Sequence, residues 1–264
     1  MQLLGGIALG IIVGYAAFRL GALTTSGAYA AAVVGGLIFG FGGLPWASLL
    51  LLFFISSSLL SRAYRQRKRP LSEKFAKGSQ RDLGQVAANG GVAAVLVLVH
   101  WYFPQMAGAW IAFAGSLAAV NADTWATELG ILSSKAPRLI TTGKPVPKGT
   151  SGGVTLAGYL ATLAGASLIA LGAGIFATPA LIVIPAVIIG GLAGATADSL
   201  LGATIQGIYY CPACGKETES HPEHHCGTET RHIRGWRWIN NDVVNLICAL
   251  IGAGVALSGW LLAS

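Results

Sequence analysis

Long apolar segments constrain this chain more than any other feature of its sequence. Segments such as 45–64 and 179–205 match the roughly 20 mostly apolar residues that a helix needs to cross a bilayer. They exceed the ~10 residues of a barrel strand and lack its alternation of apolar and polar residues. Only 10% of all residues are charged, against about 25% in a soluble domain. A soluble enzyme, a disordered tail and a secreted disulfide scaffold are therefore excluded.

Eight segments have the length and composition of membrane spans, which predicts a single transmembrane domain over residues 1–264. The expected fold class is all-α, a polytopic membrane helix bundle. The second span is rich in glycine and is a candidate for a shorter or re-entrant element. The expected spans are residues 3–23, 27–43, 45–64, 84–103, 105–132, 152–176, 179–205 and 240–262.

The basic residues predict the orientation of the bundle. All 17 Lys and Arg residues fall at the end of the first span or near three polar loops. These are the basic loop 65–83, the loop 133–151 and the loop 207–238. Because Lys and Arg concentrate in cytosolic loops, we expect this face to be cytosolic and both termini to be non-cytosolic.

The same rule explains the net charge of +7 without nucleic acid. The chain starts without the basic region of a secretory signal, so the first span is expected to remain in the mature protein. We expect a multi-pass protein surrounded by membrane lipids. Its location would be the cell membrane, or the thylakoid membrane in a photosynthetic source.

Three carboxylates interrupt the apolar spans: Asp123 and Glu128 in segment 105–132, and Asp198 in segment 179–205. Charged residues within spans are rare and are functional candidates by default. No basic residue lies mid-span to neutralise them. Sites of this kind favour Mg²⁺, held by one or two carboxylates and by substrate phosphates. We therefore predict a magnesium site, the alternative being that these acids pair with Lys or Arg and hold the bundle together.

The loop 133–151 has the composition of a phosphate-binding turn. Prolines stiffen it, Lys144 and Lys148 supply charge, and a glycine-rich turn leads into the expected span 152–176. Free backbone N–H groups at a helix start bind anions. The turn consists of Gly149, Thr150, Ser151, Gly152 and Gly153. The alternative is an ordinary basic loop that ends in a helix cap.

Further polar side chains near the same ends of the spans are candidates for substrate binding. Arg81 and Asp82 are also placed to form an ion pair with each other. The full set is Arg81, Asp82, Gln85, Asn89, Asn121, Thr124, Arg138, Ser199, Gln206, Asn241, Asp242 and Asn245.

The loop 207–238 carries cysteines and histidines at the spacing of a zinc site. Cys211 and Cys214 form a C-x2-C pair, and Cys226 follows within about a dozen residues, as zinc ligands do. Disulfides are rare on a cytosolic face. We predict a structural Zn²⁺ on these cysteines and one histidine, His225. A reduced, metal-free loop is the alternative.

Five blocks of sequence carry a resemblance to a known family. They are QRDxxQVxANG at 80–90, NADTWATELG at 121–130, GTSGG at 149–153, DSLLGATxQ at 198–206, and CxxC…HC…NxDxxN over 211–245. Together they resemble the integral membrane family that contains the phytyl-phosphate kinase of vitamin E biosynthesis. The resemblance implies transfer of the terminal phosphate of a nucleoside triphosphate, with CTP as the expected donor, to a prenyl monophosphate. The product would be a prenyl diphosphate.

This chemistry suggests roles for the candidate residues. Asp123, Glu128 and Asp198 would hold Mg²⁺ against the nucleotide phosphates. Lys144, Lys148 and the amides of 149–153 would grip the donor. The acceptor phosphate would be oriented by Arg81, Asn89 or Arg138. The prenyl tail would lie between glycine-rich helices in the bilayer.

Three other functions are alternatives to this reaction. A transporter of a divalent cation or an anionic lipid also needs intramembrane acids, but its sites usually lie near the bilayer midplane. A nucleotidyltransferase acting on a lipid phosphate would use the same Mg²⁺ and basic groups and release pyrophosphate. A purely structural membrane protein would have no use for the carboxylates.

Overall fold

The computed structural model of the protein describes residues 1–68, 74–78, 80–106 and 108–264. In this part of the chain, eight long helices form a bundle, as the sequence predicted. The second of them is a full-length helix and not a re-entrant element. The helices are α1 (Gln2–Arg19), α2 (Thr25–Gly42), α3 (Leu44–Ala63), α5 (Leu83–Tyr102), α6 (Gly108–Gly130), α7 (Leu156–Ile175), α8 (Ala180–Thr204) and α9 (Asn241–Ala263), with the short α4 (Arg65–Lys68) after α3.

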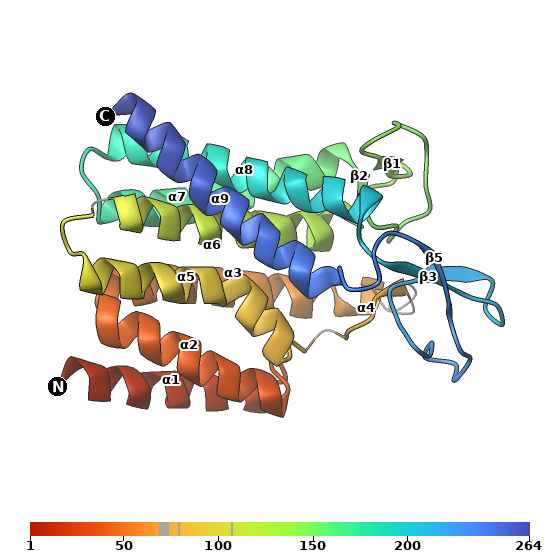
Figure 1. Ribbon diagram of the computed structural model, residues 1–264, viewed down its shortest axis with the longest axis horizontal. Coiled ribbons are helices and arrows are strands. Elements are labelled where there is room, and N and C mark those ends of the chain that lie inside the picture. The colour runs from red at the N-terminus through yellow and green to blue at the C-terminus, as the bar shows by residue number, and fades with distance from the viewer. Residues whose placement is uncertain (69–73, 79, 107) are drawn as a thin grey trace.

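Seven of the eight long helices in the described residues are long and apolar enough to cross a membrane, and α6 is the exception. It lies in the middle of the bundle and packs against α3, α5, α7, α8 and α9 (Figure 1). Of its residues 109–122, all but Trp110 are buried. Because protein surrounds this helix, it can carry Asn121, Asp123 and Glu128 without exposing them to lipid.

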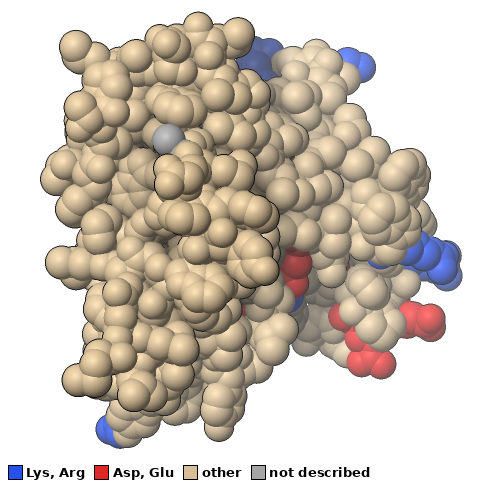
Figure 2. Space-filling view, turned by 60° about the vertical axis from the view of Figure 1, so that its left-hand side comes forward, with Lys and Arg blue, Asp and Glu red and all other residues tan. Residues whose placement is uncertain are grey.

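Both termini lie at one end of the bundle, and the long loops lie at the other, which we call the loop end (Figure 1). This arrangement follows from the even number of long helices. In Figure 2 most of the surface over the helices carries no charge, and the acidic atoms are confined to the half toward the loop end. Residues 69–73 and 79 of the predicted basic loop 65–83 lie outside the described residues.

Two small antiparallel sheets cover the loop end. Strands β1 (Arg138–Leu139) and β2 (Gly153–Val154) pair with each other. In the second sheet, β3 (Ile208–Cys211) lies between β4 (Lys216–Thr218) and β5 (Arg231–Arg234).

The helix that was expected from Gly152 begins four residues later, at Leu156, and the expectation was wrong at this point. Gly152 has a φ of +79°, outside the right-handed helical region. Gly153 belongs to β2, and the Thr155 side chain accepts a hydrogen bond from the Gly158 amide, which caps the helix. The glycine-rich turn therefore precedes the helix and does not present the amides of its first turn.

The helices α1 and α2 form a hairpin at the edge of the bundle, held together by glycines. A Cβ atom at Gly10 would lie 2.4 Å from the Ala32 carbonyl oxygen, so only glycine allows this approach. Of the two helices, α2 makes the main contacts with α3 and α5. A space between α1, α2, α3 and α5 results, and it leads toward the loop end.

Candidate functional site

A polar cavity of about 850 Å³ opens at the loop end. Its wall includes residues of α3, α5, α6, α7, α8 and α9 and of the loops between them. Nearly all the candidate residues line it, although they come from distant parts of the sequence. These are Arg81, Gln85, Asn89, Asp123, Thr124, Glu128, Lys148, Gly149, Thr150, Ser151, Gly152, Gly153, Ser199, Asp198, Gln206, Asn241, Asp242 and Asn245.

Asp123 of α6 and Asp198 of α8 are in direct contact through a hydrogen bond between their carboxyl groups. Small residues allow this approach, since a Cβ at Gly194 would come within 2.4 Å of the Ala119 Cβ. Oδ2 of Asp198 is buried and has no hydrogen-bond partner among the described residues. Two adjacent carboxylates cannot both ionise cheaply unless a cation or a shared proton lies between them. The pair is therefore suited to a divalent cation.

Glu128 lies apart from this pair, although the sequence placed all three acids in one site. It follows Asp123 by five residues, which turns it about 140° around the helix axis. The Ser61 hydroxyl donates to Glu128 Oε1 at 2.6 Å. Among the described residues, Asp123, Glu128 and Asp198 do not form a group with all ligand atoms within 4.8 Å. The structure thus brings two of the three acids together, Asp123 and Asp198.

Arg81 lies opposite Glu128 at the edge of the cavity. Its Nη1 donates to the Ser58 hydroxyl at 3.0 Å, and its guanidinium lies 5.7 Å from the ring centres of both Phe53 and Phe54. Burial lowers the pKa of Arg81 to about 10, while the charge of Glu128 acts in the opposite direction. Arg81 therefore stays cationic at neutral pH and is suited to hold an anion.

An apolar groove of about 80 Å³ adjoins the polar cavity between α1, α2, α3 and α5. It follows α1 from Leu9 to Ala17, about 12 Å at 1.5 Å per residue. Arg81, Gln85 and Asn89 line both the groove and the cavity. A ligand with an anionic head and an apolar tail fits this junction.

Four of the residues expected to act in catalysis or substrate binding do not line the cavity. Asn121 is fully buried, where its Nδ2 donates to the Gly165 carbonyl and its Oδ1 accepts from Ser56 and Ser57. These bonds hold α3, α6 and α7 together, so the Asn121 side chain connects helices and does not face the cavity.

The other three candidates outside the cavity are either exposed to solvent or bonded to other groups of the protein. Arg138 is exposed and donates to the Gly143 carbonyl at 2.8 Å, and Lys144 is exposed in the same loop. Asp82 does not pair with Arg81 as expected. It pairs with Lys77 at 2.9 Å and forms a capping box with Gln85 at the start of α5.

Lys148 lines the cavity, but its ammonium group donates hydrogen bonds to backbone carbonyls of the protein itself. Nζ donates to the carbonyls of Ile131 and Ser133, at 3.2 and 2.6 Å, just beyond the end of α6. Lys74 in turn donates to the Lys148 carbonyl at 2.8 Å. These bonds fix the position of the glycine-rich turn that follows Lys148.

Lys77 and Glu219 are charged cavity residues that the sequence reasoning missed. Lys77 bridges Asp82 and Asp242, and these hydrogen bonds raise its pKa although burial acts to lower it. Glu219 accepts from Ser151 at 3.0 Å and from Gln206 at 2.9 Å, and burial raises its pKa. Neither residue belongs to a recognisable motif within its loop, so no local signal marked them.

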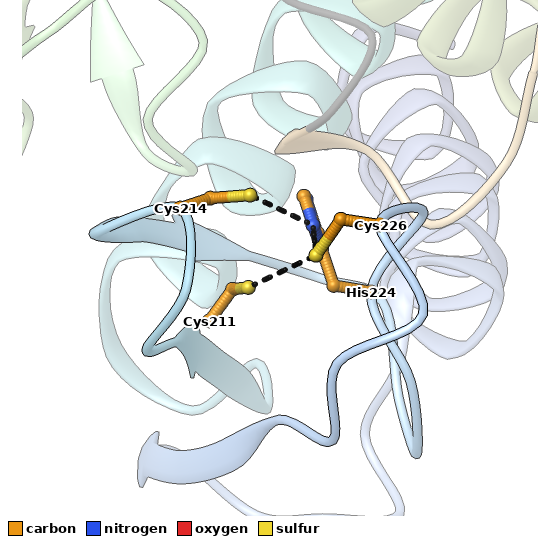
Figure 3. A group of neighbouring side chains, drawn as sticks. All are labelled: Cys211, Cys214, His224 and Cys226. Atoms are coloured by element: carbon orange, nitrogen blue, oxygen red, sulfur yellow. Dashed lines mark hydrogen bonds between the residues drawn. The ribbon is translucent and has the colours of Figure 1, made fainter.

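The cysteine cluster forms as expected, with a different histidine. Cys211, Cys214, His224 and Cys226 point toward one another (Figure 3), with all four ligand atoms within 4.8 Å. His225 was the expected ligand, and this choice was wrong. His224 is buried, whereas His225 is exposed and its Nε2 lies 3.3 Å from the Phe75 carbonyl oxygen. The side chains of the adjacent residues His224 and His225 point in different directions, and the turn directs His224 toward the cysteines.

Comparisons with known proteins identify relatives across several kingdoms. Protein PGR of Arabidopsis thaliana is 34% identical over 274 residues, which cover 95% of this chain and 93% of PGR. An uncharacterised membrane protein of Methanocaldococcus jannaschii is 36% identical over 184 residues, covering 70% of this chain and 75% of that protein. Protein VTE6, chloroplastic, of A. thaliana is 27% identical over 247 residues, covering 89% of this chain and 64% of VTE6.

No solved structure matches the chain. The profile of the family described as integral membrane protein DUF92 matches residues 8–253. The expected membership of a multi-pass membrane family is therefore confirmed: the chain belongs to the DUF92 family of integral membrane proteins.

Proposed function

We propose that this protein transfers the terminal phosphate of a nucleoside triphosphate to a prenyl monophosphate, and that CTP is the donor. The observation that carries the proposal is the junction of the polar cavity and the apolar groove at Arg81, Gln85 and Asn89. A prenyl monophosphate has one dianionic head and one apolar tail, which matches these two compartments. The sequence blocks that resemble the family of the phytyl-phosphate kinase support the same reaction class.

The acceptor would lie with its tail along α1 and α2 and its phosphate beside Arg81. The guanidinium can bind two phosphate oxygens at once. A phosphate monoester is mostly dianionic at neutral pH, since its second pKa is about 6. The acceptor therefore needs no general base. It needs a fixed position and neutralisation of the charge that two phosphate groups bring together.

The donor would lie on the opposite side of the cavity, near the turn 149–153 and the pair Asp123 and Asp198. Mg²⁺ is the cofactor that suits these two carboxylates, and it would neutralise the phosphates of the donor. An oxygen of the acceptor phosphate forms a bond to the γ-phosphorus. The bond from that phosphorus to the β-phosphate oxygen breaks, and the nucleoside diphosphate leaves.

The position of the cavity supports an enzyme over a transporter. Transporter sites usually lie near the bilayer midplane, whereas this cavity is built at the loop end. Nucleotidyl transfer to a lipid phosphate would use the same residues. It differs in its products, a nucleotide-linked lipid and pyrophosphate.

The test uses purified protein in detergent with phytyl monophosphate, Mg²⁺ and either CTP or ATP, with lipid products identified by mass spectrometry. We expect phytyl diphosphate, and its loss in Asp123→Asn. Glu229→Gln is the matched control, because Glu229 is an exposed carboxylate that does not line the cavity. Absence of product from folded protein with phytyl, geranylgeranyl and longer monophosphates would refute the proposal.

A further inference from the structure

Two similar turns build the cysteine cluster. Cys211 ends β3, Cys214 follows in the turn toward β4, and Gly215 comes next with a φ of +63°. His224 and Cys226 occupy the second turn, which Gly227 follows with a φ of +79°. Each glycine amide closes its turn, Gly215 to the Cys211 carbonyl at 2.9 Å and Gly227 to the His224 carbonyl at 2.8 Å. A side chain at either glycine would strain the turn.

The separations of the ligand atoms match a tetrahedral zinc centre. Zn–S bonds of about 2.3 Å and Zn–N bonds of about 2.0–2.1 Å give tetrahedron edges of about 3.8 Å between sulfurs and about 3.6 Å between sulfur and nitrogen. The observed Cys211–Cys226 distance between Sγ atoms is 3.6 Å. His224 Nδ1 lies 3.5 Å from Cys214 Sγ and 3.3 Å from Cys226 Sγ.

The same distances argue against a disulfide. The Cys211 and Cys226 sulfurs, 3.6 Å apart, lie well beyond an S–S bond of about 2.05 Å. A closed set of three cysteines and one histidine leaves no position for a substrate, which is typical of a structural zinc site. The cluster residues are also absent from the wall of the polar cavity.

The loop that carries the cluster holds one wall of the cavity. The Glu219 amide donates to the Lys74 carbonyl at 2.9 Å, and the Ser220 hydroxyl lies 3.5 Å from the Phe75 carbonyl oxygen. His225, between two cluster residues, also contacts this carbonyl. Segment 74–78 therefore rests on the cysteine loop, and it supplies Lys77 to the cavity.

We propose that Cys211, Cys214, His224 and Cys226 bind one structural Zn²⁺, and that this ion fixes the cavity wall formed by Glu219 and segment 74–78. The site is independent of the proposed reaction, because it rests on the geometry of the loop alone. Without the ion, the loop keeps the hydrogen bonds of its two turns, a short three-stranded sheet and its contacts with segment 74–78, but it loses the bonds that join the two turns.

The first test measures zinc in protein purified under reducing conditions without a chelator. We expect about one zinc per chain by elemental analysis. Its loss is expected in His224→Asn and in the double variant Cys211→Ser with Cys214→Ser. Two matched controls should retain it: His225→Asn, next to the cluster, and Cys248→Ser, a buried cysteine of α9. Metal-free wild type, or full zinc in His224→Asn, overturns the site.

A second test needs no variant and so does not depend on variants that fold. Zinc in the wild-type protein is exchanged for Co²⁺, whose absorption bands report tetrahedral thiolate ligation. Bands of octahedral, oxygen-ligated cobalt would overturn the assignment. Hydrogen exchange then compares wild type before and after chelation. We expect faster exchange at the Glu219 amide and unchanged exchange in α6 and α8; unchanged exchange at Glu219 would refute the link to the cavity wall.

Discussion

Replacing Asn121 by alanine distinguishes a structural residue from a substrate-binding one. The side chain makes three hydrogen bonds, to Ser56, Ser57 and the Gly165 carbonyl, at 3.1, 3.0 and 2.8 Å. Interhelical hydrogen bonds in membrane proteins contribute about 0.6 kcal/mol each on average, with a maximum near 1.7 kcal/mol. Loss of all three therefore costs about 2 kcal/mol, with a ceiling of about 5 kcal/mol. The smaller figure reduces the folding equilibrium constant about 30-fold.

The assay is equilibrium unfolding in mixed detergent micelles, followed by circular dichroism. Asn245→Ala is the matched control, because Asn245 is a half-buried asparagine that lines the cavity. We expect Asn121→Ala to be destabilised and Asn245→Ala to unfold like wild type. A double-mutant cycle with Ser57→Ala should show coupling between the two residues. Wild-type stability of Asn121→Ala together with lost product formation would refute this reasoning and return Asn121 to the substrate site.

Three further predictions follow from the packing and the charges. Gly194→Val should lower the free energy of unfolding by about 1–3 kcal/mol through overpacking, since its Cβ would lie 2.4 Å from the Ala119 Cβ. Thermal unfolding measures this loss. An unchanged midpoint would contradict the α6–α8 contact. Gly35→Leu should fill the apolar groove and raise KM for phytyl monophosphate. For a short-chain prenyl monophosphate, both kcat and KM should stay near the wild-type values. Equal effects on both acceptors would exclude the groove as the tail site. Lys77→Met should lower the unfolding midpoint by a constant amount between about pH 5 and pH 9. The reason is that the ion pair raises the pKa of Lys77, while the Gln85 amide and then Lys77 lower the pKa of Asp82. The difference should shrink as the pH falls through the lowered pKa of Asp82, below its ordinary value of about 3.9; a difference that instead vanishes near neutral pH would contradict the pairing.

The sequence predicted the eight helices because the length and composition of a segment are local properties. It also predicted that Asp123 and Asp198 act together, since both follow the same small-residue pattern near the ends of their helices. It did not show that Glu128 lies apart from this pair, where the five-residue offset decided which neighbouring helix the side chain meets. It failed at Gly152, where a positive φ and the cap at Thr155 moved the helix start.

The sequence alone determined that this chain is a multi-pass membrane protein with its polar groups at one end. The physical reason is that lipid accepts neither charges nor unpaired backbone groups, so the polar residues had to gather in the loops. Only the tertiary structure decided which polar groups meet. Lys77, Glu219 and His224 reach their positions through contacts between segments far apart in the chain. Such contacts depend on the packing of whole helices and loops, and no local pattern encodes them.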